Sequence, residues 1–349
     1  MTRPDLAGTD KPLTALHDVA LLDLDGVVYV GTDPVPGAAD AIERVRAAGM
    51  RVAFVTNNAS RSPADVAALL HQVGVEATAD DVVTSAQAGA RVLAARIPPG
   101  SAVLVVGSDA LAAEVSALGL RAVRSADGRP AGVIQGFDRA VGWSALAEAT
   151  VAIRYGADWV ATNADRTIPS PRGALPGNGA LVEVVRLVSG AAPTVTGKPE
   201  PALHEESVRR TGAAHPLVVG DRLDTDIAGA VRAGCASLLV LTGVTTVPDL
   251  LAAGPDHRPT YLAGDLGGLL VAHPQPKRSG GAWSCRRFTA RRSGDSLTLS
   301  GSDDPDGDPI DAVRALCAAV WAEQPVRAPA VAGDGSAATQ ILRRFGLAG

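Results

Sequence analysis

Short apolar runs alternate with amphipathic helical patterns in two separate stretches of the chain, 18–90 and 216–241. Strands separated by helices favour a parallel sheet joined by right-handed crossovers. Because the second stretch continues the pattern of the first, we expect both to build one doubly wound α/β core. The expected strands are 19–24, 51–56, 82–85, 216–220 and 237–241, and the expected helices are 38–48, 63–73 and 226–233.

The segment between these stretches has an α/β pattern of its own. Its expected strands, 102–107, 132–135 and 159–161, are numerous enough for a separate module inserted into the core. After the proline-rich segment 273–276, the chain predicts a hairpin over 283–300 and a helix over 311–323. We therefore expect a core in two parts, 1–88 and 191–270, an inserted α/β cap, 89–190, and a linker with a small α+β accessory domain, 271–349.

Composition narrows the classes of partner. The formal net charge of -5 argues against a nucleic-acid-binding protein, which needs a basic surface to neutralise phosphates, and favours a small-molecule partner. The sequence shows neither a signal peptide nor an apolar run of about 20 residues, so we expect a cytoplasmic protein with no membrane span. Cys235, Cys285 and Cys317 are widely spaced and fit buried thiols in a reducing compartment.

Acidic side chains follow two of the expected core strands. Asp23 and Asp25 come directly after an apolar run and are followed by Gly26, and a second acidic loop runs from Asp221 to Asp226. Two carboxylates this close raise each other's pKa, so the pair persists only where a cation or a shared chemical task offsets the repulsion. Carboxylate oxygens are the ligands that Mg2+ prefers, and open parallel sheets bind ligands at the carboxyl ends of their strands.

Two further segments offer groups that suit a phosphate. Thr56, Asn57 and Asn58 end a strand before a helix and supply a hydroxyl, amides and backbone N–H groups. Lys198 lies between Gly197 and Pro199 and carries a compact charge matched to a phosphate oxygen. Each segment alone is compatible with an ordinary turn, helix cap or surface loop. In this order, each after an expected strand, the four segments together indicate phosphate chemistry.

These four segments resemble the four motifs of the haloacid dehalogenase superfamily of phosphatases, over roughly residues 18–270. The inserted module resembles that of the subfamily with a large α/β cap, which includes nitrophenyl phosphate, phosphoglycolate, pyridoxal phosphate and glycerol phosphate phosphatases. The segment 161–165, with Pro169, Gly173 and 176–179, resembles the part of the cap that faces the active site. Ile168 falls where family members carry a substrate-contacting residue.

The resemblance implies a role for each candidate residue. Asp23 is the expected nucleophile that forms an aspartyl-phosphate, and Asp25 is the expected general acid and then base. Mg2+ is expected on the carboxylates of Asp23 and Asp221 and on the backbone carbonyl of Asp25, with Asp226 outside the metal ligands or in contact with a bound water. The residues expected to hold the phosphoryl oxygens are Thr56, Asn57, Asn58 and Lys198.

The substrate is less constrained than the reaction. The small aliphatic Ile168 and an aromatic content of 3% disfavour a bulky stacked ring. The resemblance is strongest to actinobacterial glycerol 3-phosphate phosphatases, so we expect glycerol 3-phosphate, a metabolite of glycerophospholipid metabolism, to be hydrolysed to glycerol and phosphate. Phosphoglycolate, pyridoxal phosphate and nucleoside monophosphates stay open as substrates.

Two other functions are weighed against a phosphatase, and two possible interactions stay open. A regulatory protein that only binds a phosphorylated metabolite is disfavoured by the intact pair of Asp23 and Asp25. An acyltransferase activity of the tail is disfavoured because the tail has no Arg/Gln-x-x-Gly-x-Gly/Ala loop. A homo-oligomer formed through the cap stays open, and so does an anionic ligand for the basic stretch 277–292.

Overall fold

The computed structural model describes residues 6–168, 170, 172–302, 307–322 and 330–347. Pro169, part of the cap segment named above, lies outside these residues. The chain forms two compact units, one made of Met1–Val52 with Ala213–Gly349 and the other of Ala53–Gly212. Among the described helices, none is long and apolar enough to cross a bilayer.

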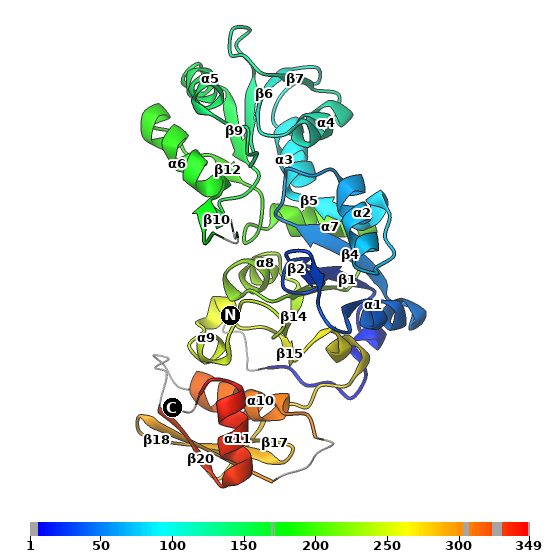
Figure 1. Ribbon diagram of the computed structural model, residues 1–349, viewed down its shortest axis with the longest axis vertical. Helices are drawn as coiled ribbons and strands as arrows, with labels where there is room; N and C mark the ends of the chain where they lie inside the picture. Colours follow the sequence, from blue (N-terminus) through cyan, green and yellow to red (C-terminus); the bar gives the residue numbers. More distant parts are fainter. Residues whose placement is uncertain (1–5, 169, 171, 303–306, 323–329, 348–349) are drawn as a thin grey trace. The chain divides into compact units, whose positions relative to one another are not determined.

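A parallel sheet organises the core (Figure 1), with the strand order β15-β14-β13-β1-β4-β5. Its strands are β1 (Val19–Leu22), β4 (Arg51–Thr56), β5 (Val82–Thr84), β13 (Pro216–Gly220), β14 (Ala236–Val240) and β15 (Tyr261–Ala263). Every residue of β1 is buried, as expected for a strand covered on both faces. The sheet confirms the expected doubly wound core, and the boundary between the two compact units falls within β4.

The core helices include the three that were expected, over 38–48, 63–73 and 226–233, and others that were not predicted. They are α1 (Ala38–Ala47), α2 (Pro63–Gln72), α3 (Ser85–Ala94), α7 (Ala202–Thr211), α8 (Ala228–Arg232) and α9 (Val247–Leu251), and a short hairpin joins β2 (Tyr29–Val30) to β3 (Asp33–Pro34). The helix expected to begin at 226 instead begins after a π-helical turn, Leu223–Ile227. Such turns occur frequently at functional sites.

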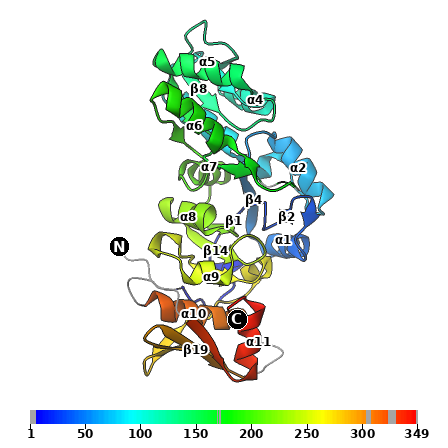
Figure 2. The same ribbon diagram turned by 60° about the vertical axis from the view of Figure 1, so that its left-hand side comes forward.

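The second unit contains a separate parallel sheet with the strand order β12-β9-β8-β6-β7. Its elements are β6 (Ala102–Val106), α4 (Asp109–Ala117), β7 (Arg121–Val123), β8 (Gly132–Gln135), α5 (Trp143–Arg154), β9 (Asp158–Ala161), β10 (Thr167–Ile168), β11 (Leu175–Pro176), α6 (Asn178–Ser189) and β12 (Thr194–Val195). Alternate strand residues pack on α3 and α4 on one face and on α5 and α6 on the other. Figures 1 and 2 show α5 and α6 side by side on their face of this sheet.

This unit confirms the expected α/β module but is wider than the expected insertion 89–190. It also includes β5 with the flanking helices α2, α3 and α7. Gly89 lies inside α3, where an added Cβ would be 3.2 Å from the Thr196 hydroxyl. Of these three helices only α2 was predicted from the sequence, and α3 spans the expected boundary between 88 and 89.

The C-terminal part forms a five-stranded sheet of its own with two helices. Its elements are β16 (Lys277–Ser279), β17 (Ala282–Cys285), β18 (Phe288–Ser293), β19 (Ser296–Gly301), α10 (Ile310–Trp321), β20 (Ala330–Asp334) and α11 (Ser336–Arg344). The hairpin and the first helix were expected, whereas β16, β20 and α11 were not. The α+β class of this domain is confirmed.

Helix α10 is buried at every residue, because it packs on its own sheet and also on α9 and β15. The indole N–H of Trp321 donates to the Leu250 carbonyl at 3.3 Å, and the Arg314 guanidinium donates to the Leu262 carbonyl and the Asp311 carboxylate. One hydrophobic cluster includes residues of α9, α10, β14 and β18. The C-terminal domain and the first unit's core therefore share apolar packing rather than forming separate cores.

Candidate active site

The first cluster of functional side chains lies in the first unit and begins where β1 ends. The backbone N–H of Asp23 donates to the Val219 carbonyl at 2.8 Å, which continues the pairing of β1 with β13 past the last residue of the strand. Asp23 is half-buried and Asp25 is exposed. Gly26 follows with a φ of 86°, a left-handed conformation that favours glycine, and its N–H donates to the Tyr29 carbonyl at 2.7 Å.

Asp221 and Asp226 come from the loop and π-helical turn after β13, and both are buried. The turn directs the Asp226 carboxylate back to the backbone N–H of Arg222, which donates to it at 3.1 Å. The Arg222 side chain instead pairs with Asp224, and these hydrogen bonds hold the pKa of Asp224 below its ordinary value. The loop therefore offers Asp221 and Asp226 to the cluster, while Asp224 is paired with its neighbour.

The loop after β14 completes the cluster and was missed by the sequence analysis. The Val244 N–H donates to the Asp221 carboxylate at 2.6 Å, and the Thr242 hydroxyl donates to the Gly26 carbonyl at 2.6 Å. The signal that could have found it is the run Thr242–Gly243–Val244, which follows a core strand at the same edge as Asp23 and Asp221.

The donor set suits a hard divalent cation. Asp23, Asp221 and Asp226 each offer a carboxylate oxygen, and these oxygens lie within 4.8 Å of one another. Three carboxylates at this spacing need positive charge, and Mg2+ takes oxygen ligands of this kind. A Cβ on Gly26 would lie 2.5 Å from an oxygen of Asp221, so the turn leaves room beside that carboxylate that any other residue would fill.

The second cluster lies in the second unit and begins where β4 ends. The Thr56 hydroxyl is mostly buried and accepts a hydrogen bond from the Asn58 N–H at 3.1 Å. The Asn58 carboxamide oxygen accepts two hydrogen bonds from Ser60, at 2.7 and 2.9 Å. The loop after β4 is therefore a turn stabilised by its own side chains, followed by α2 with a capping box at Ser62.

Asn57 joins this loop to Lys198. The Asn57 carboxamide oxygen accepts from the Lys198 N–H at 2.7 Å, and its NH2 group donates to the Lys198 carbonyl at 3.1 Å. Lys198 is 4% exposed, and its ammonium lies 3.5 Å from the Val55 carbonyl. Gly197 permits this approach, because a Cβ there would lie 2.7 Å from the Asn57 carboxamide oxygen.

His204, on α7, is a buried imidazole of the second unit. Burial lowers the pKa of His204 from 6.5 to about 3, with a smaller contribution from the Lys198 charge. Within the described residues, neither ring nitrogen has a hydrogen-bond partner. His204 is therefore neutral at physiological pH, and the positively charged group near it is the Lys198 ammonium.

Ile168 lies on a short hairpin of the cap, paired with Leu175 of β11, and is half-buried. The segment that leads to it is bonded to the loop after β4. The Asn163 carboxamide donates to the Asn57 carbonyl at 2.8 Å, and Asp165 accepts from the Asn57 carboxamide at 3.3 Å. The sequence resemblance predicts that this segment faces the active site, but it gives no site role to Asn163 or Asp165.

Family models match three stretches of the chain. A haloacid dehalogenase-like hydrolase model matches residues 20–121, and an HAD-hydrolase-like model matches residues 195–269. A model of a GCN5-related N-acetyltransferase like domain matches residues 285–347. The first two matches cover the segments that carry all the candidate residues except Ile168.

Two curated relatives align over most of their lengths. The chain is 47% identical over 322 residues to the D-glycerol 3-phosphate phosphatase of Mycobacterium tuberculosis, covering 89% of this chain and 88% of that protein. It is 36% identical over 248 residues to the acid sugar phosphatase of Staphylococcus aureus, covering 70% of this chain and 94% of that protein.

Solved structures extend the similarity to the fold. The crystal structure of a glycerol phosphate phosphatase from Mycobacterium tuberculosis in complex with magnesium has a TM-score of 0.86 at 45% sequence identity, covering 97% of this chain and 99% of that chain. A p-nitrophenyl phosphatase from Archaeoglobus fulgidus has a TM-score of 0.67 at 28% identity, covering 73% of this chain and 98% of that one.

Proposed function

The chain belongs to the haloacid dehalogenase-like hydrolases and is a phosphatase, and we propose that it hydrolyses glycerol 3-phosphate to glycerol and phosphate with Mg2+. The observation that carries the reaction class is the cluster of Asp23, Asp221 and Asp226 at the ends of two core strands. The substrate is proposed from the name of the Mycobacterium tuberculosis relative and from the small aliphatic Ile168.

Asp23 is the nucleophile in this proposal. Its carboxylate oxygen forms a bond to phosphorus while the bond from phosphorus to the ester oxygen breaks, and Asp25 gives its proton to the departing alkoxide. Asp25 then takes a proton from the water that attacks the aspartyl-phosphate, which releases phosphate and restores Asp23. Its exposed position after the strand leaves Asp25 open to solvent water.

Mg2+ is proposed to bind the carboxylates of Asp23 and Asp221 and the backbone carbonyl of Asp25, with Asp226 outside these ligands or in contact with a bound water. When bound, the ion supplies the positive charge that lets a dianionic ester approach a carboxylate. The Val244 N–H and the Arg222 N–H fix the orientation of two of these carboxylates.

Thr56, Asn57, Asn58 and Lys198 are proposed to hold the phosphoryl oxygens. The Lys198 ammonium and the backbone N–H groups of the loop after β4 are the donors that fit an anion. The carboxamide of Asn57 is bonded to Lys198, so we assign the phosphate contact of this residue to its backbone.

A phosphate-release screen tests this proposal. The purified protein is assayed on glycerol 3-phosphate, phosphoglycolate, pyridoxal phosphate and a nucleoside monophosphate, with Mg2+ and with a chelator in excess. We expect release that requires Mg2+ and has its highest kcat/KM on glycerol 3-phosphate. If another ester has the highest kcat/KM, glycerol 3-phosphate is not the preferred substrate. If no ester releases phosphate, the protein is a metabolite-binding protein and not an enzyme.

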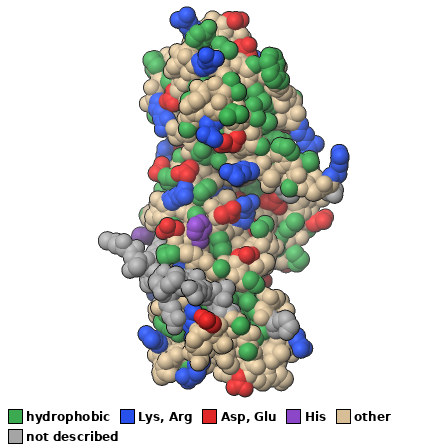
Figure 3. Space-filling model, turned by 90° about the vertical axis from the view of Figure 1, so that its left-hand side faces the viewer, with side chains coloured by type: hydrophobic (Ala, Val, Ile, Leu, Met, Phe, Trp, Pro, Cys, Tyr) green, Lys and Arg blue, Asp and Glu red, His purple; other side chains and the backbone are tan. Residues whose placement is uncertain are grey.

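We also propose that the chain assembles through its cap. Exposed apolar side chains lie at both ends of α5 and on α6, where Trp143, Tyr155, Leu187 and Val188 are each more than half exposed. Figure 3 shows apolar side chains spread over the cap on the side that these helices cover. Exposed apolar patches mark association surfaces. Light scattering after gel filtration is expected to give a dimer for the wild type and a monomer for Leu187→Glu, and an unchanged mass overturns the interface.

A cytoplasmic location completes the proposal. It rests on Cys235, Cys285 and Cys317, which are buried and form no disulfide in the part of the chain that the structure describes, as expected in a reducing compartment. Fractionation of the source cells tests it, and recovery of the protein outside the cytoplasmic fraction overturns it.

A further inference from the structure

The carboxamide of Asn57 makes three hydrogen bonds inside the second unit. Its carboxamide oxygen accepts from Lys198, and its NH2 group donates to the Lys198 carbonyl at 3.1 Å and to the Asp165 carboxylate at 3.3 Å. An asparagine side chain has two N–H donors, so both donors have protein partners. The carboxamide therefore joins two segments that are 108 and 141 positions away in the sequence.

The backbone carbonyl of Asn57 is also hydrogen-bonded within the second unit. Its carbonyl accepts from the Asn163 carboxamide at 2.8 Å and from the Ser85 hydroxyl at 2.6 Å. Asn163 is 4% exposed, and its own backbone carbonyl accepts from Asn178, the first residue of α6, at 2.7 Å. Asn163 thus connects the cap loop after β9 both to the N-terminus of α6 and to the loop after β4.

Asp165 is held in place by this loop. Its N–H donates to the Asn163 carboxamide oxygen at 3.2 Å, which places its carboxylate toward Asn57. Ile168, three residues further, pairs with β11 instead. One short segment of the cap therefore carries two kinds of residue, one bonded to the loop after β4 and one on the hairpin that follows.

We propose that Asp165 and Asn163 are positioning residues, which fix Asn57 and through it Lys198. The cap loop then sets how strongly the phosphoryl group is held, separately from the choice of the organic group, which belongs to Ile168. This inference rests on the proposed phosphatase function. Its distinguishing consequence is that loss of the Asp165 carboxylate weakens all phosphate esters, and inorganic phosphate itself, by one common factor.

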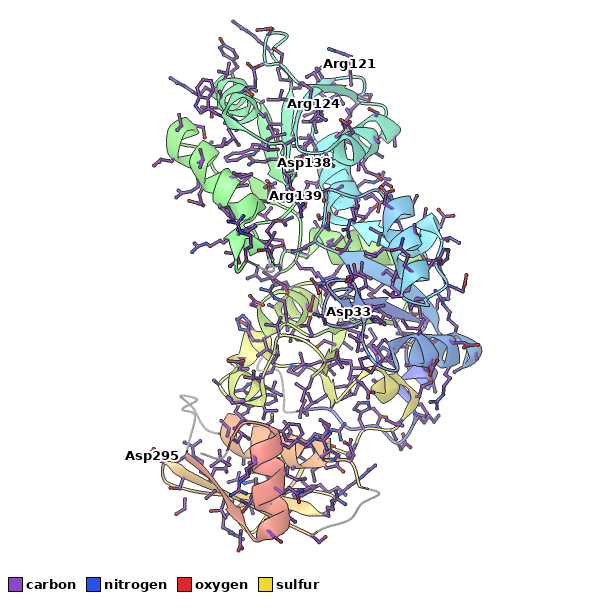
Figure 4. All side chains as sticks on the ribbon, viewed as in Figure 1. Asp33, Arg121, Arg124, Asp138, Arg139 and Asp295 are labelled. Carbon is purple, nitrogen blue, oxygen red and sulfur yellow. The ribbon has the colours of Figure 1, made fainter. Side chains whose placement is uncertain are left out.

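Three variants of the Mg2+-loaded protein test this consequence. Asp165→Ala removes the acceptor, Asp165→Asn keeps an oxygen that can accept from Asn57, and Asp138→Ala is the matched control. Asp138 is also a half-buried cap carboxylate after a strand, labelled in Figure 4, but it accepts from Ala140 at 2.7 Å. Phosphate affinity is measured by calorimetry, and KM and kcat by phosphate release on glycerol 3-phosphate, phosphoglycolate and pyridoxal phosphate.

For Asp165→Ala we expect phosphate affinity and kcat/KM to fall roughly 5- to 100-fold, as when a half-buried donor loses a charged partner, by a similar factor for every ester. Asp165→Asn is expected to recover most of this loss, and Asp138→Ala to match the wild type. Where Asp165→Ala does not fold, Asp165→Ser, whose shorter side chain cannot reach Asn57 in the same way, replaces it.

Three results overturn the positioning role. A changed ranking of esters in Asp165→Ala would place Asp165 against the organic group. Equal losses in Asp165→Asn and Asp165→Ala would show that the charge, and not the hydrogen bond, is required. Unchanged phosphate affinity in Asp165→Ala would show that Asp165 does not affect binding of the phosphoryl group. A wild-type protein that binds phosphate but hydrolyses no ester would instead overturn the proposed function, and the calorimetry would still decide the positioning role.

Discussion

The two clusters of candidate site residues are built in different ways. In the first unit, Asp221 and Asp226 are oriented by backbone N–H groups of short loops that follow core strands. In the second unit, Asn57 is bonded through side chains to Lys198, Asp165 and Asn163, all more than 100 positions away. The carboxylates of Asp221 and Asp226 are thus oriented by backbone N–H groups, whereas Asn57 and Lys198 are oriented by hydrogen bonds of amide side chains.

The difference extends to charge. The first cluster brings three carboxylates within 4.8 Å of one another and calls for a cation. The second cluster contains neutral amides, a neutral His204, the buried Lys198 ammonium and one carboxylate, Asp165, which accepts from Asn57. Its Lys198 charge and backbone N–H groups suit an anion. The comparison assigns metal binding to the first cluster and phosphate binding to the second.

The largest expected effect is that of Asp23→Asn in the carboxylate cluster. The amide keeps the shape of the side chain but cannot attack phosphorus, so we expect kcat to fall by at least about 1000-fold. Binding of inorganic phosphate, which we assign to the other cluster, is expected to persist at least in part. Phosphate release and calorimetry measure the two quantities, and substantial turnover in a carefully purified variant would exclude Asp23 as the nucleophile.

Asp25→Asn is expected to have a smaller and less uniform effect. A general acid contributes about 100- to 10000-fold where the leaving group needs a proton. We therefore expect a large loss on glycerol 3-phosphate and a small one on an aryl phosphate, whose leaving group needs little protonation. Comparing kcat/KM on the two esters measures the difference, and equal losses would contradict the acid role.

The contrast between the clusters also explains what could be predicted from the sequence. Asp23, Asp221 and Asp226 follow strands whose alternation is visible in the chain, so their grouping follows from the parallel sheet. The bonds of Asn57 could not be predicted, because they depend on which distant loops meet. Val244, which donates to Asp221, was also missed, although its loop follows core strand β14 at the same edge of the sheet.

The C-terminal part shows a second limit. The helix expected over 311–323 is present as α10, yet nothing in its sequence pattern predicts burial on every side. That burial results from packing on both its own sheet and the core elements α9 and β15. Strand β20 was missed because it pairs with β19 across a long chain separation.

In the second unit, Ile168 offers a way to separate substrate choice from phosphate binding. Replacing Ile168 with Phe is expected to change the ratio of kcat/KM values among glycerol 3-phosphate, phosphoglycolate and pyridoxal phosphate by about 10- to 200-fold, since one altered apolar contact is worth about 1 to 3 kcal/mol. The inhibition constant of inorganic phosphate is the internal control and is expected to change little. If kcat/KM changed by one common factor for all three esters, Ile168 would have no part in substrate recognition.

The smallest expected effect is on the pH dependence of stability. The pKa of His204 is about 3 in the folded protein and 6.5 ordinarily, so the unfolded chain binds this proton at a higher pH. Its contribution to stability is therefore full above about pH 6.5 and is lost as the pH falls toward 3, by at most about 1.4 kcal/mol per pH unit.

Urea unfolding at pH 7.5 and 5 measures this loss. His204→Leu is expected to lose less stability between the two pH values than the wild type, and His71→Gln, at an exposed position, is expected to behave like the wild type. An identical loss in His204→Leu and the wild type would contradict a buried neutral imidazole.

The division of labour between the two clusters is tested most directly by calorimetric titration of Mg2+ and of inorganic phosphate into Asp221→Asn and Lys198→Met. We expect Asp221→Asn to weaken Mg2+ binding by at least about tenfold, since it removes the charge of a proposed ligand. Lys198→Met is expected to leave Mg2+ binding within about twofold of the wild type while phosphate affinity falls by about 100-fold or more. Equal effects of the two variants on Mg2+ binding, or unchanged phosphate affinity in Lys198→Met, would contradict the account.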